Sequence, residues 1–375
     1  MRARLFQATR PGLRVLDVRE LARHASAEAR REAAMKIGLV GFAGSGKSTV
    51  FNTMTGLVVP VGYGSEVRLG AVRVPDARID TLSKIFSPKK TTYAEMSFCD
   101  IPGERGAERK GLSAKALQPI REQDALCLVL RDFEDDANPL RDLEAFHLEC
   151  VFADLDIVER RLRRAQKEHA TPREVAQFEL MKNVLEDGRP LRSVSSSELD
   201  RGALKGYGFL SDQPLLVAVN RDEGRAGSPL PNDLDARIGA LNARGLVLSA
   251  SVEAEIAKID AAEQAAFLED LGLHESALAR FIRAAYGLLD LISFFTVGAD
   301  EVRAWPIRRG AVARQAAGRI HSDLERGFIR AEVIPYATFM KLGSEQAVKD
   351  AGLLQIEGKD HAVADGDIMH IRFNV

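Results

Sequence analysis

Short apolar runs that end in polar or glycine-containing clusters recur along the sequence. The clearest run is LLVAVN at 215–220, which is followed by Asp222 and Glu223. Runs of four to eight apolar residues with such boundaries are typical of buried strands in a parallel sheet. The same pattern recurs in KIGLV at 36–40, AEMSFCD at 94–100, ALCLVL at 125–130 and LVLSAS at 246–251. We therefore expect an α/β domain with polar residues at the carboxyl ends of its strands, where open α/β sheets bind ligands.

Between residues 139 and 191 the apolar positions are spaced as in helices. The pattern stops near Ala170-Thr171-Pro172 and then resumes; its members are Leu143, Phe146, Cys150, Leu155, Val158, Leu162, Val175, Phe178, Met181 and Leu185. Apolar residues three or four positions apart line one face of a helix, and a proline favours the start of a new one. The segment therefore predicts an antiparallel helical hairpin inserted into the sheet domain. Beyond Ile292, short strand-like runs and glycine turns predict a compact β-rich domain.

These patterns predict the domain organisation of the chain. Residues 1–34 form an extension, 35–138 and 206–290 the sheet domain, 139–205 the helical arm, and 291–375 the β-rich domain. The extension carries eight arginines against four acidic residues. A transit peptide is one interpretation, although such peptides usually lack acidic residues. We favour a dispensable, disordered extension or a start codon placed too early, with Met35 as the functional start.

Composition excludes several classes of protein. With 46% hydrophobic and 28% charged residues, the 375-residue chain resembles an ordinary globular protein, and no apolar run is long enough to cross a bilayer. A net charge of −2 provides no general attraction to nucleic acid. Cys99, Cys127 and Cys150 are too few and too scattered for a disulfide framework or a zinc site. We therefore expect a cytoplasmic protein without membrane contact.

The stretch GFAGSGKS at 41–48 fits the phosphate-binding pattern G-x-x-x-x-G-K-[ST]. It follows a predicted strand and precedes a helical pattern, which is the order that the motif requires. Its glycines let successive N–H groups point at phosphate oxygens, and the following helix adds the positive end of its dipole. We expect Lys47 to reach the terminal phosphates and Ser48 to bind Mg²⁺. The predicted nucleotide contacts are Gly41, Gly44, Ser45, Gly46, Lys47, Ser48 and Thr49.

A second strand-like run ends at Asp100, which is followed by Gly103. A carboxylate at a strand end beside a phosphate loop usually holds Mg²⁺ through water, and the glycine of D-x-x-G can donate its N–H to the terminal phosphate. The motif alone is common in turns, but here it lies about fifty residues after a P-loop and at the end of a strand. Asp100 is therefore predicted as a metal residue and Gly103 as a nucleotide contact.

The residues after LLVAVN occupy the place of a base-recognition motif. GTP-binding P-loop proteins read guanine with N-K-x-D, in which the Asp carboxylate accepts two guanine N–H groups. Here Asn220, Arg221 and Glu223 stand at three of those positions. The longer Glu cannot keep the same bidentate geometry, so guanine loses bonds of roughly 1.5–3 kcal/mol each. ATP is thus expected to bind at least as tightly as GTP, unless the loop shifts by one residue and Asp222 reads guanine instead.

The P-loop, the N-x-x-E motif and three C-terminal stretches together resemble the Obg-like ATPase family, also called the YchF type. The stretches are SFFTVGADEVRAW, QAAGRIHSDLERGFIRAEVI and DGDIMHIRFNV, and the resemblance covers Met35 to Val375. It implies a P-loop NTPase domain interrupted by a helical arm and followed by a TGS domain. It also implies slow hydrolysis of ATP in preference to GTP, ribosome binding and a link to translation, and we expect a monomer. Ser249 and Ala250 match the family's loop that touches the base.

Several positions depart from the family pattern. Gly44 stands where the family has an Asn that in related GTPases supports a K⁺ site, so stimulation by K⁺ is left open. Gly64 aligns with a Thr that completes the Mg²⁺ shell, and the neighbouring Ser65 is the available substitute. Glu104 replaces a hydrophobic residue, and Pro119 aligns with a family His. Glu104 is the one candidate for a catalytic group, and no general base is assigned.

Three functions are compatible with these residues. The first is an ATPase whose nucleotide state moves the switch regions and controls ribosome binding. The second is a nucleotide-binding, ribosome-associated module with little hydrolysis. The third is a GTPase of the same fold.

Overall fold

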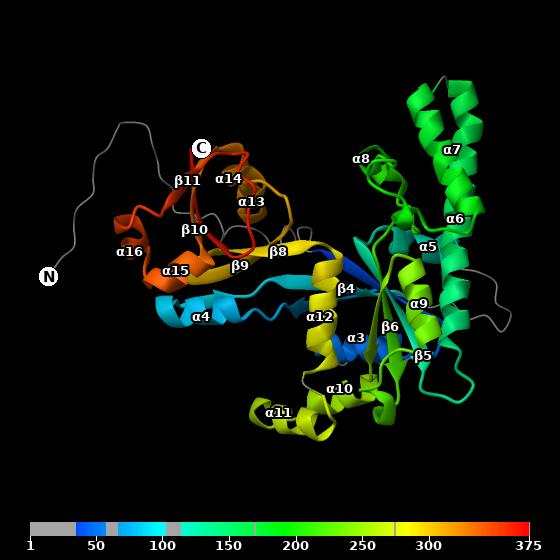
Figure 1. Ribbon diagram of the computed structural model, residues 1–375, viewed down its shortest axis with the longest axis horizontal. Helices are drawn as coiled ribbons and strands as arrows, with labels where there is room; N and C mark the ends of the chain where they lie inside the picture. Colours follow the sequence, from blue (N-terminus) through cyan, green and yellow to red (C-terminus); the bar gives the residue numbers. More distant parts are fainter. Residues whose placement is uncertain (1–34, 58–66, 103–113, 169, 274, 375) are drawn as a thin grey trace. The chain divides into compact units, whose positions relative to one another are not determined.

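The computed structural model describes residues 35–57, 67–102, 114–168, 170–273 and 275–374. These residues form two compact units. The P-loop unit contains Met35–Val72 and Met96–Leu289, and the C-terminal unit contains Arg73–Glu95 and Asp290–Val375. Each unit has a six-stranded sheet of its own (Figure 1).

The sheet of the P-loop unit has the strand order β2-β4-β1-β5-β6-β7. Its strands are β1 (Lys36–Val40), β2 (Arg68–Arg73), β4 (Glu95–Asp100), β5 (Ala125–Asp132), β6 (Leu215–Arg221) and β7 (Arg244–Leu248). Strands β4, β1, β5, β6 and β7 pair in parallel. Every residue of β6 is buried, as its continuous apolar run predicts. The predicted parallel α/β sheet is confirmed.

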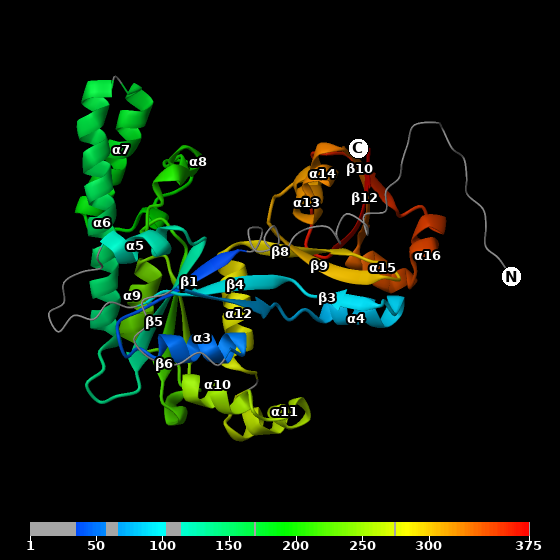
Figure 2. The ribbon, with the colours of Figure 1, turned by 180° about the vertical axis from the view of Figure 1, so that it is seen from behind.

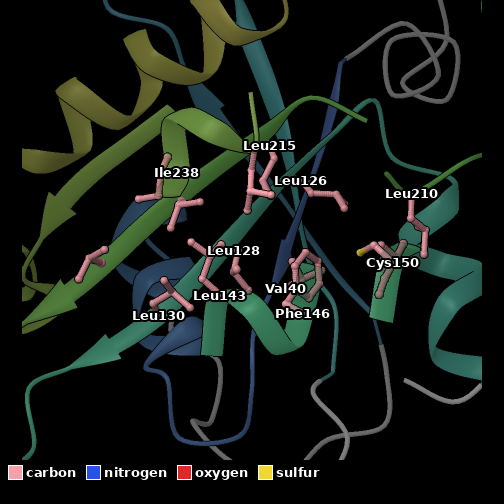
Figure 3. Packing of buried hydrophobic residues seen from close by; sticks show 14 of the residues in the cluster. Val40, Leu126, Leu128, Leu130, Leu143, Phe146, Cys150, Leu210, Leu215 and Ile238 are labelled. Carbon is pink, nitrogen blue, oxygen red and sulfur yellow. The ribbon is translucent and has the colours of Figure 1, made fainter. Parts of the chain in front are cut away.

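Helices cover both faces of this sheet. The structure contains α3 (Lys47–Thr55), α5 (Ala114–Arg121), α9 (Asn232–Ala240), α10 (Ala250–Ile256), α11 (Ala261–Asp270) and α12 (Ala277–Leu288). Figures 1 and 2 show α9 on one face and α3 and α12 on the other. Figure 3 shows the core on the α9 face, where alternate residues of β5 (Leu126, Leu128 and Leu130) share one apolar cluster with Ile238 of α9. Burial of alternate apolar residues on one sheet face is the main force that holds α9 in place.

The inserted segment contains two long helices, α6 (Pro139–Glu168) and α7 (Pro172–Glu186), that run side by side in Figures 1 and 2. Thr171 caps α7 by accepting a hydrogen bond from the Glu174 N–H at 3.2 Å. The hairpin has its own apolar core, which includes Val158, Phe178 and Met181. Short helical turns follow at η1 (Leu191–Ser193), α8 (Arg201–Leu204) and η2 (Lys205–Tyr207). The helical pattern of the sequence thus corresponds to a hairpin with its break at the predicted place.

The C-terminal unit is a mixed sheet with the strand order β11-β10-β12-β8-β9-β3. Its strands are β3 (Lys90–Thr92), β8 (Leu291–Thr296), β9 (Glu301–Arg308), β10 (Phe328–Pro335), β11 (Gln355–Glu357) and β12 (Asp367–Phe373). Its helices are α4 (Ala77–Phe86), α13 (Ala313–Ile320), α14 (Ser322–Arg326), α15 (Tyr336–Leu342) and α16 (Glu345–Asp350). Phe294, Trp305 and the alanines of α13 lie in its core. The predicted β-containing C-terminal domain is present.

The segment Arg73–Glu95 departs from the predicted boundary, which placed it in the sheet domain of the P-loop. It groups with the C-terminal unit because β3 pairs in parallel with β9, with Thr91 opposite Val302. Arg78 of α4 adds an ion pair with Asp365, at 3.1 Å between its Nη1 and the carboxylate Oδ2. A strand of three residues is too short to show an alternation of apolar and polar positions, so the sequence does not predict that β3 pairs with β9.

Candidate functional site

The P-loop lies between β1 and α3, as predicted. Gly46 precedes the first residue of α3 and has φ 83°, a left-handed conformation that favours glycine. A Cβ at this position would lie 2.2 Å from Asn220 Nδ2. Gly41 is equally constrained, because a Cβ there would lie 2.6 Å from the carbonyl oxygen of Val129. The loop therefore needs glycine both for its curvature and for the close approach of its neighbours.

Three predicted residues meet at the start of α3. Lys47 Nζ lies 2.5 Å from Asp100 Oδ1, and Ser48 Oγ donates to Asp100 Oδ2 at 3.1 Å. Lys47 and Asp100 are buried, whereas Arg68 of β2 approaches the same carboxylate at 3.7 Å from the partly exposed side. An aliphatic hydroxyl and a carboxylate are hard oxygen donors, the type that Mg²⁺ prefers. The amino group of Lys47 can exchange the carboxylate for a phosphate oxygen, since both are anionic acceptors.

A buried hydroxyl also faces this loop. Ser45 is 4% exposed, and its Oγ has no hydrogen-bond partner among the described residues. An unpaired buried hydroxyl costs free energy, which an acceptor on a bound anion would offset. With the amide groups at the start of the nine-residue helix α3, Ser45 makes the loop suitable for phosphate.

Asn220 connects three segments that the sequence predicted to meet. Its Nδ2 donates to the carbonyl oxygen of Ser45 at 3.1 Å, and its Oδ1 accepts from the Ala250 N–H at 3.0 Å. The side chain is buried at 4% exposure. Ser249 precedes Ala250 at the end of β7, and its Oγ lies 3.0 Å from Ser251 Oγ. The P-loop, the end of β6 and the 249–250 loop are therefore held together by one amide side chain.

Arg221 has a structural role that the sequence did not reveal. Its Nε donates to Asp132 Oδ2 at 2.7 Å, and its Nη1 donates to the carbonyl oxygens of Ser228 and Pro229. The guanidinium is thus bound to protein acceptors and is only 4% exposed. Asp132 ends β5 directly opposite Arg221, in a register that no short motif encodes. The expected role of Arg221 in the base-recognition motif stays a prediction.

The two acidic residues of the base motif have different surroundings. Glu223 is exposed at the start of the turn η3 (Glu223–Arg225), and its side chain has no bonding partner within the ranges that the structure covers. Asp222, by contrast, accepts a hydrogen bond from Arg225 Nε at 2.6 Å. That bond lowers the pKa of the Asp222 carboxyl and raises the pKa of Arg225. The carboxylate that could replace Glu223 is therefore already paired.

A further buried carboxylate lies behind the base-side loop. Glu253 of α10 accepts hydrogen bonds from the backbone N–H groups of Ala277 at 2.6 Å and Leu278 at 3.2 Å. These groups begin α12, so Glu253 caps that helix from a different element. Burial raises the pKa of the Glu253 carboxyl. The sequence contains no local signal for this contact because its partners are more than twenty positions apart.

Other predicted site residues lie outside the described residues: Gly103, Glu104, Gly64, Ser65 and the extension 1–34. Pro119 lies within α5. In the part of the chain that the structure covers, no helix is long and apolar enough to span a membrane. Over the same residues, no cluster of three or more His, Cys, Asp or Glu side chains could hold a metal by itself. A cation at Asp100 would therefore need ligands of other kinds, such as the Ser48 hydroxyl, a nucleotide or water.

Comparison with known proteins agrees with this geometry. Residues 36–158 match a family model described as "50S ribosome-binding GTPase", and residues 291–374 match the model YchF-GTPase_C, described as "Protein of unknown function (DUF933)". The chain is 38% identical to "Ribosome-binding ATPase YchF" of Bacillus subtilis (strain 168) over 369 residues, covering 91% of this chain and 100% of that protein. The chain is 40% identical over 363 residues to the protein of the same name from Haemophilus influenzae, and the match covers 91% of this chain and 99% of that protein.

A solved structure extends the similarity to the fold. The YchF GTPase of Schizosaccharomyces pombe superposes with a TM-score of 0.82 and 30% identity, covering 90% of this chain and 97% of that chain. Sequence and fold therefore agree over both units. With 38–40% identity over 91% of this chain and agreement in fold, the chain belongs to the YchF family.

Proposed function

We propose that this protein binds and slowly hydrolyses ATP at the P-loop, accepts GTP less well, and associates with ribosomes. The observation that carries the proposal is the convergence of Lys47 and Ser48 on Asp100 beside a glycine loop that Asn220 anchors. This arrangement resembles a phosphoryl-transfer site, with a glycine loop for phosphates, a cationic side chain and a carboxylate that could hold a metal. The relatives with the same architecture are named ribosome-binding ATPases.

Each part has a chemical task in this proposal. The loop from Gly41 to Thr49 binds the phosphates through backbone N–H groups, and Lys47 bonds the terminal phosphates. Ser48 and Asp100 hold Mg²⁺, with Ser65 as a further candidate ligand. The metal, when bound, neutralises charge on the phosphates. Gly103 donates its N–H to the terminal phosphate, and Glu104 is the candidate that orients water.

The base is held by the loops at the ends of β6 and β7. Asn220 retains an amide N–H beyond the one that it donates to Ser45, and that N–H can bond N7 of a purine. Ser249 and Ala250 lie beside Asn220, whose side chain accepts a hydrogen bond from the Ala250 N–H. Glu223 disfavours guanine because its carboxylate lies one methylene farther from its backbone than the carboxylate of Asp. ATP is therefore the preferred nucleotide.

Replacing Glu223 with Asp should raise the affinity for GTP several-fold and leave the affinity for ATP nearly unchanged. The shorter side chain restores a pair of charge-assisted bonds to guanine, which amounts to about 1–3 kcal/mol at best. Dissociation constants for both nucleotides, measured by calorimetry on the parent and the variant, test this. Asp222→Ala is the matched control and should change little, because Asp222 is bonded to Arg225. A parent that prefers GTP tenfold, with that preference lost in Asp222→Ala, would reverse the assignment.

The ribosome is the proposed partner, and a cytoplasmic monomer is the proposed form. We assign the contact to the helical arm at 139–205 and to the TGS domain at 291–375. The distal part of α6 carries exposed Arg160 and Arg163. These arginines are partly neutralised by Asp156 and Glu159, at 2.8 and 3.4 Å, so the arm offers a modest rather than a dominant positive charge.

Co-sedimentation with purified ribosomes should detect binding at low salt, and the bound fraction should fall as salt rises. The comparison is made with ATP, with ADP and without nucleotide. A shortened arm, in which 156–186 is replaced by a glycine-serine linker, should bind more weakly while keeping ATP affinity. Failure to sediment with ribosomes under any of these conditions would contradict the proposed partner.

A further inference from the structure

A cluster of four charged residues lies beside the base-recognition loop. Asp132 is 9% exposed and accepts from Arg221 Nε through Oδ2, at 2.7 Å. Arg225 approaches the same residue twice, with Nη1 3.4 Å from Oδ1 and Nη2 2.6 Å from the backbone oxygen. Arg225 also bonds Asp222 through Nε at 2.6 Å. The chain from 221 to 225 is therefore fixed at both ends on Asp132.

Asp222 belongs to the same base-recognition loop as Asn220 and Glu223. It stands two residues after Asn220, whose side chain bonds Ser45 and Ala250, and directly before Glu223. A register shift of one residue in this loop would put the Asp222 carboxylate in the place of Glu223. A free carboxylate there could accept guanine N–H groups.

We propose that Arg225 is a positioning residue for nucleobase choice, which holds the Asp222 carboxylate on the protein and so withholds it from guanine. The inference rests on the proposed nucleotide site. A carboxylate selects guanine only if its oxygens accept the two N–H donors of the base edge, and one oxygen of Asp222 already accepts from Arg225. The guanidinium also neutralises the charge that would make such bonds strong.

The anchoring of Arg225 makes this pair more than an ordinary surface ion pair. Asp222 and Arg225 have side-chain exposures of 43% and 47%, and a pair this exposed would normally contribute little. Here Asp132 provides two further acceptors that orient the fork of the guanidinium. These two contacts with Asp132 therefore orient the Nε–H of Arg225 toward Asp222. Beyond Asp222, Asp132 is the charged group that contacts Arg225 in the described part of the chain.

The test is a mutant cycle on nucleotide choice. Arg225→Ala frees Asp222 and should raise the ratio of GTP affinity to ATP affinity by about three- to tenfold. Adding Asp222→Ala to that variant should return the ratio to that of the parent. Arg225→Lys retains the charge but not the fork geometry, and should give an intermediate ratio. Affinities for ATP, GTP and both diphosphates are measured by calorimetry, with melting temperatures as a check on folding.

The outcomes separate this inference from the proposed function. A parent that binds neither nucleotide would contradict the proposed function. A parent that binds ATP, with an unchanged ratio in Arg225→Ala, would overturn the inference alone. Equal loss of ATP and GTP affinity would also overturn it, because that result indicates that Arg225 packs on the purine. A raised ratio that persists in the double variant would show that Asp222 is not the residue released.

Discussion

Replacing Lys47 with alanine should abolish measurable ATP binding. Lys47 is the buried cation at the start of α3, and its amino group faces the Asp100 carboxylate at the place where phosphate oxygens would enter. Charge-assisted bonds to two phosphates contribute about 1.5–3 kcal/mol each, so their loss corresponds to roughly a hundredfold or more in affinity. Calorimetric titration with ATP and Mg²⁺ is the measurement.

Two controls keep this result interpretable. Lys258→Ala removes an exposed lysine of the same unit and should bind ATP like the parent. Since Lys47→Ala also leaves a buried carboxylate with one bond fewer, Lys47→Gln, which retains most of the side-chain length, is measured beside it. Both Lys47 variants should keep the circular dichroism spectrum of the parent. ATP binding at parental affinity by folded Lys47→Ala would refute the phosphate site.

Much of this site could be predicted because its determinants are local in sequence. The run 36–40 is β1, and the run 215–220 becomes β6 with one residue more. Because parallel strands present their carboxyl ends at one edge, the strand pattern alone placed Asn220 near the P-loop. The structure shows in addition that the Asn220 side chain is held beside the P-loop by hydrogen bonds to Ser45 and Ala250.

The features that the sequence did not predict depend on register and on distant partners. Asp132 meets Arg221 only because β5 and β6 pair with those two residues opposite each other. Arg225 ends the three-residue turn η3, which is too short for periodicity to indicate the direction of its side chain. The transfer of Arg73–Glu95 to the C-terminal unit depends on the three-residue strand β3, which is too short for a pattern to be visible.

The largest effect on stability is expected from Asp154, which joins the helical arm to the rest of the P-loop unit. The side chain is fully buried on α6, and its Oδ1 accepts from Arg121 Nη1 at 3.1 Å. It also accepts from the backbone N–H groups of Leu210 and Ser211, at 3.0 and 2.7 Å. One carboxylate thus satisfies two buried amides and the arginine that ends α5.

Asp154→Ala should lower the free energy of unfolding by about 3–5 kcal/mol, because it leaves two buried amides without their acceptor and removes the carboxylate from the Arg121 guanidinium, which keeps only backbone carbonyl acceptors among the described residues. Chemical denaturation followed by circular dichroism measures the change. Asp156→Ala is the control on the same helix. Asp156 is 62% exposed and pairs with the exposed Arg160, so its loss should lower the free energy of unfolding by less than about 0.5 kcal/mol. Asp154→Asn retains one acceptor oxygen and should lie between the two. A loss below about 1 kcal/mol in Asp154→Ala would mean that water or a rearranged loop replaces the carboxylate, and that the arm is held by its apolar contacts alone.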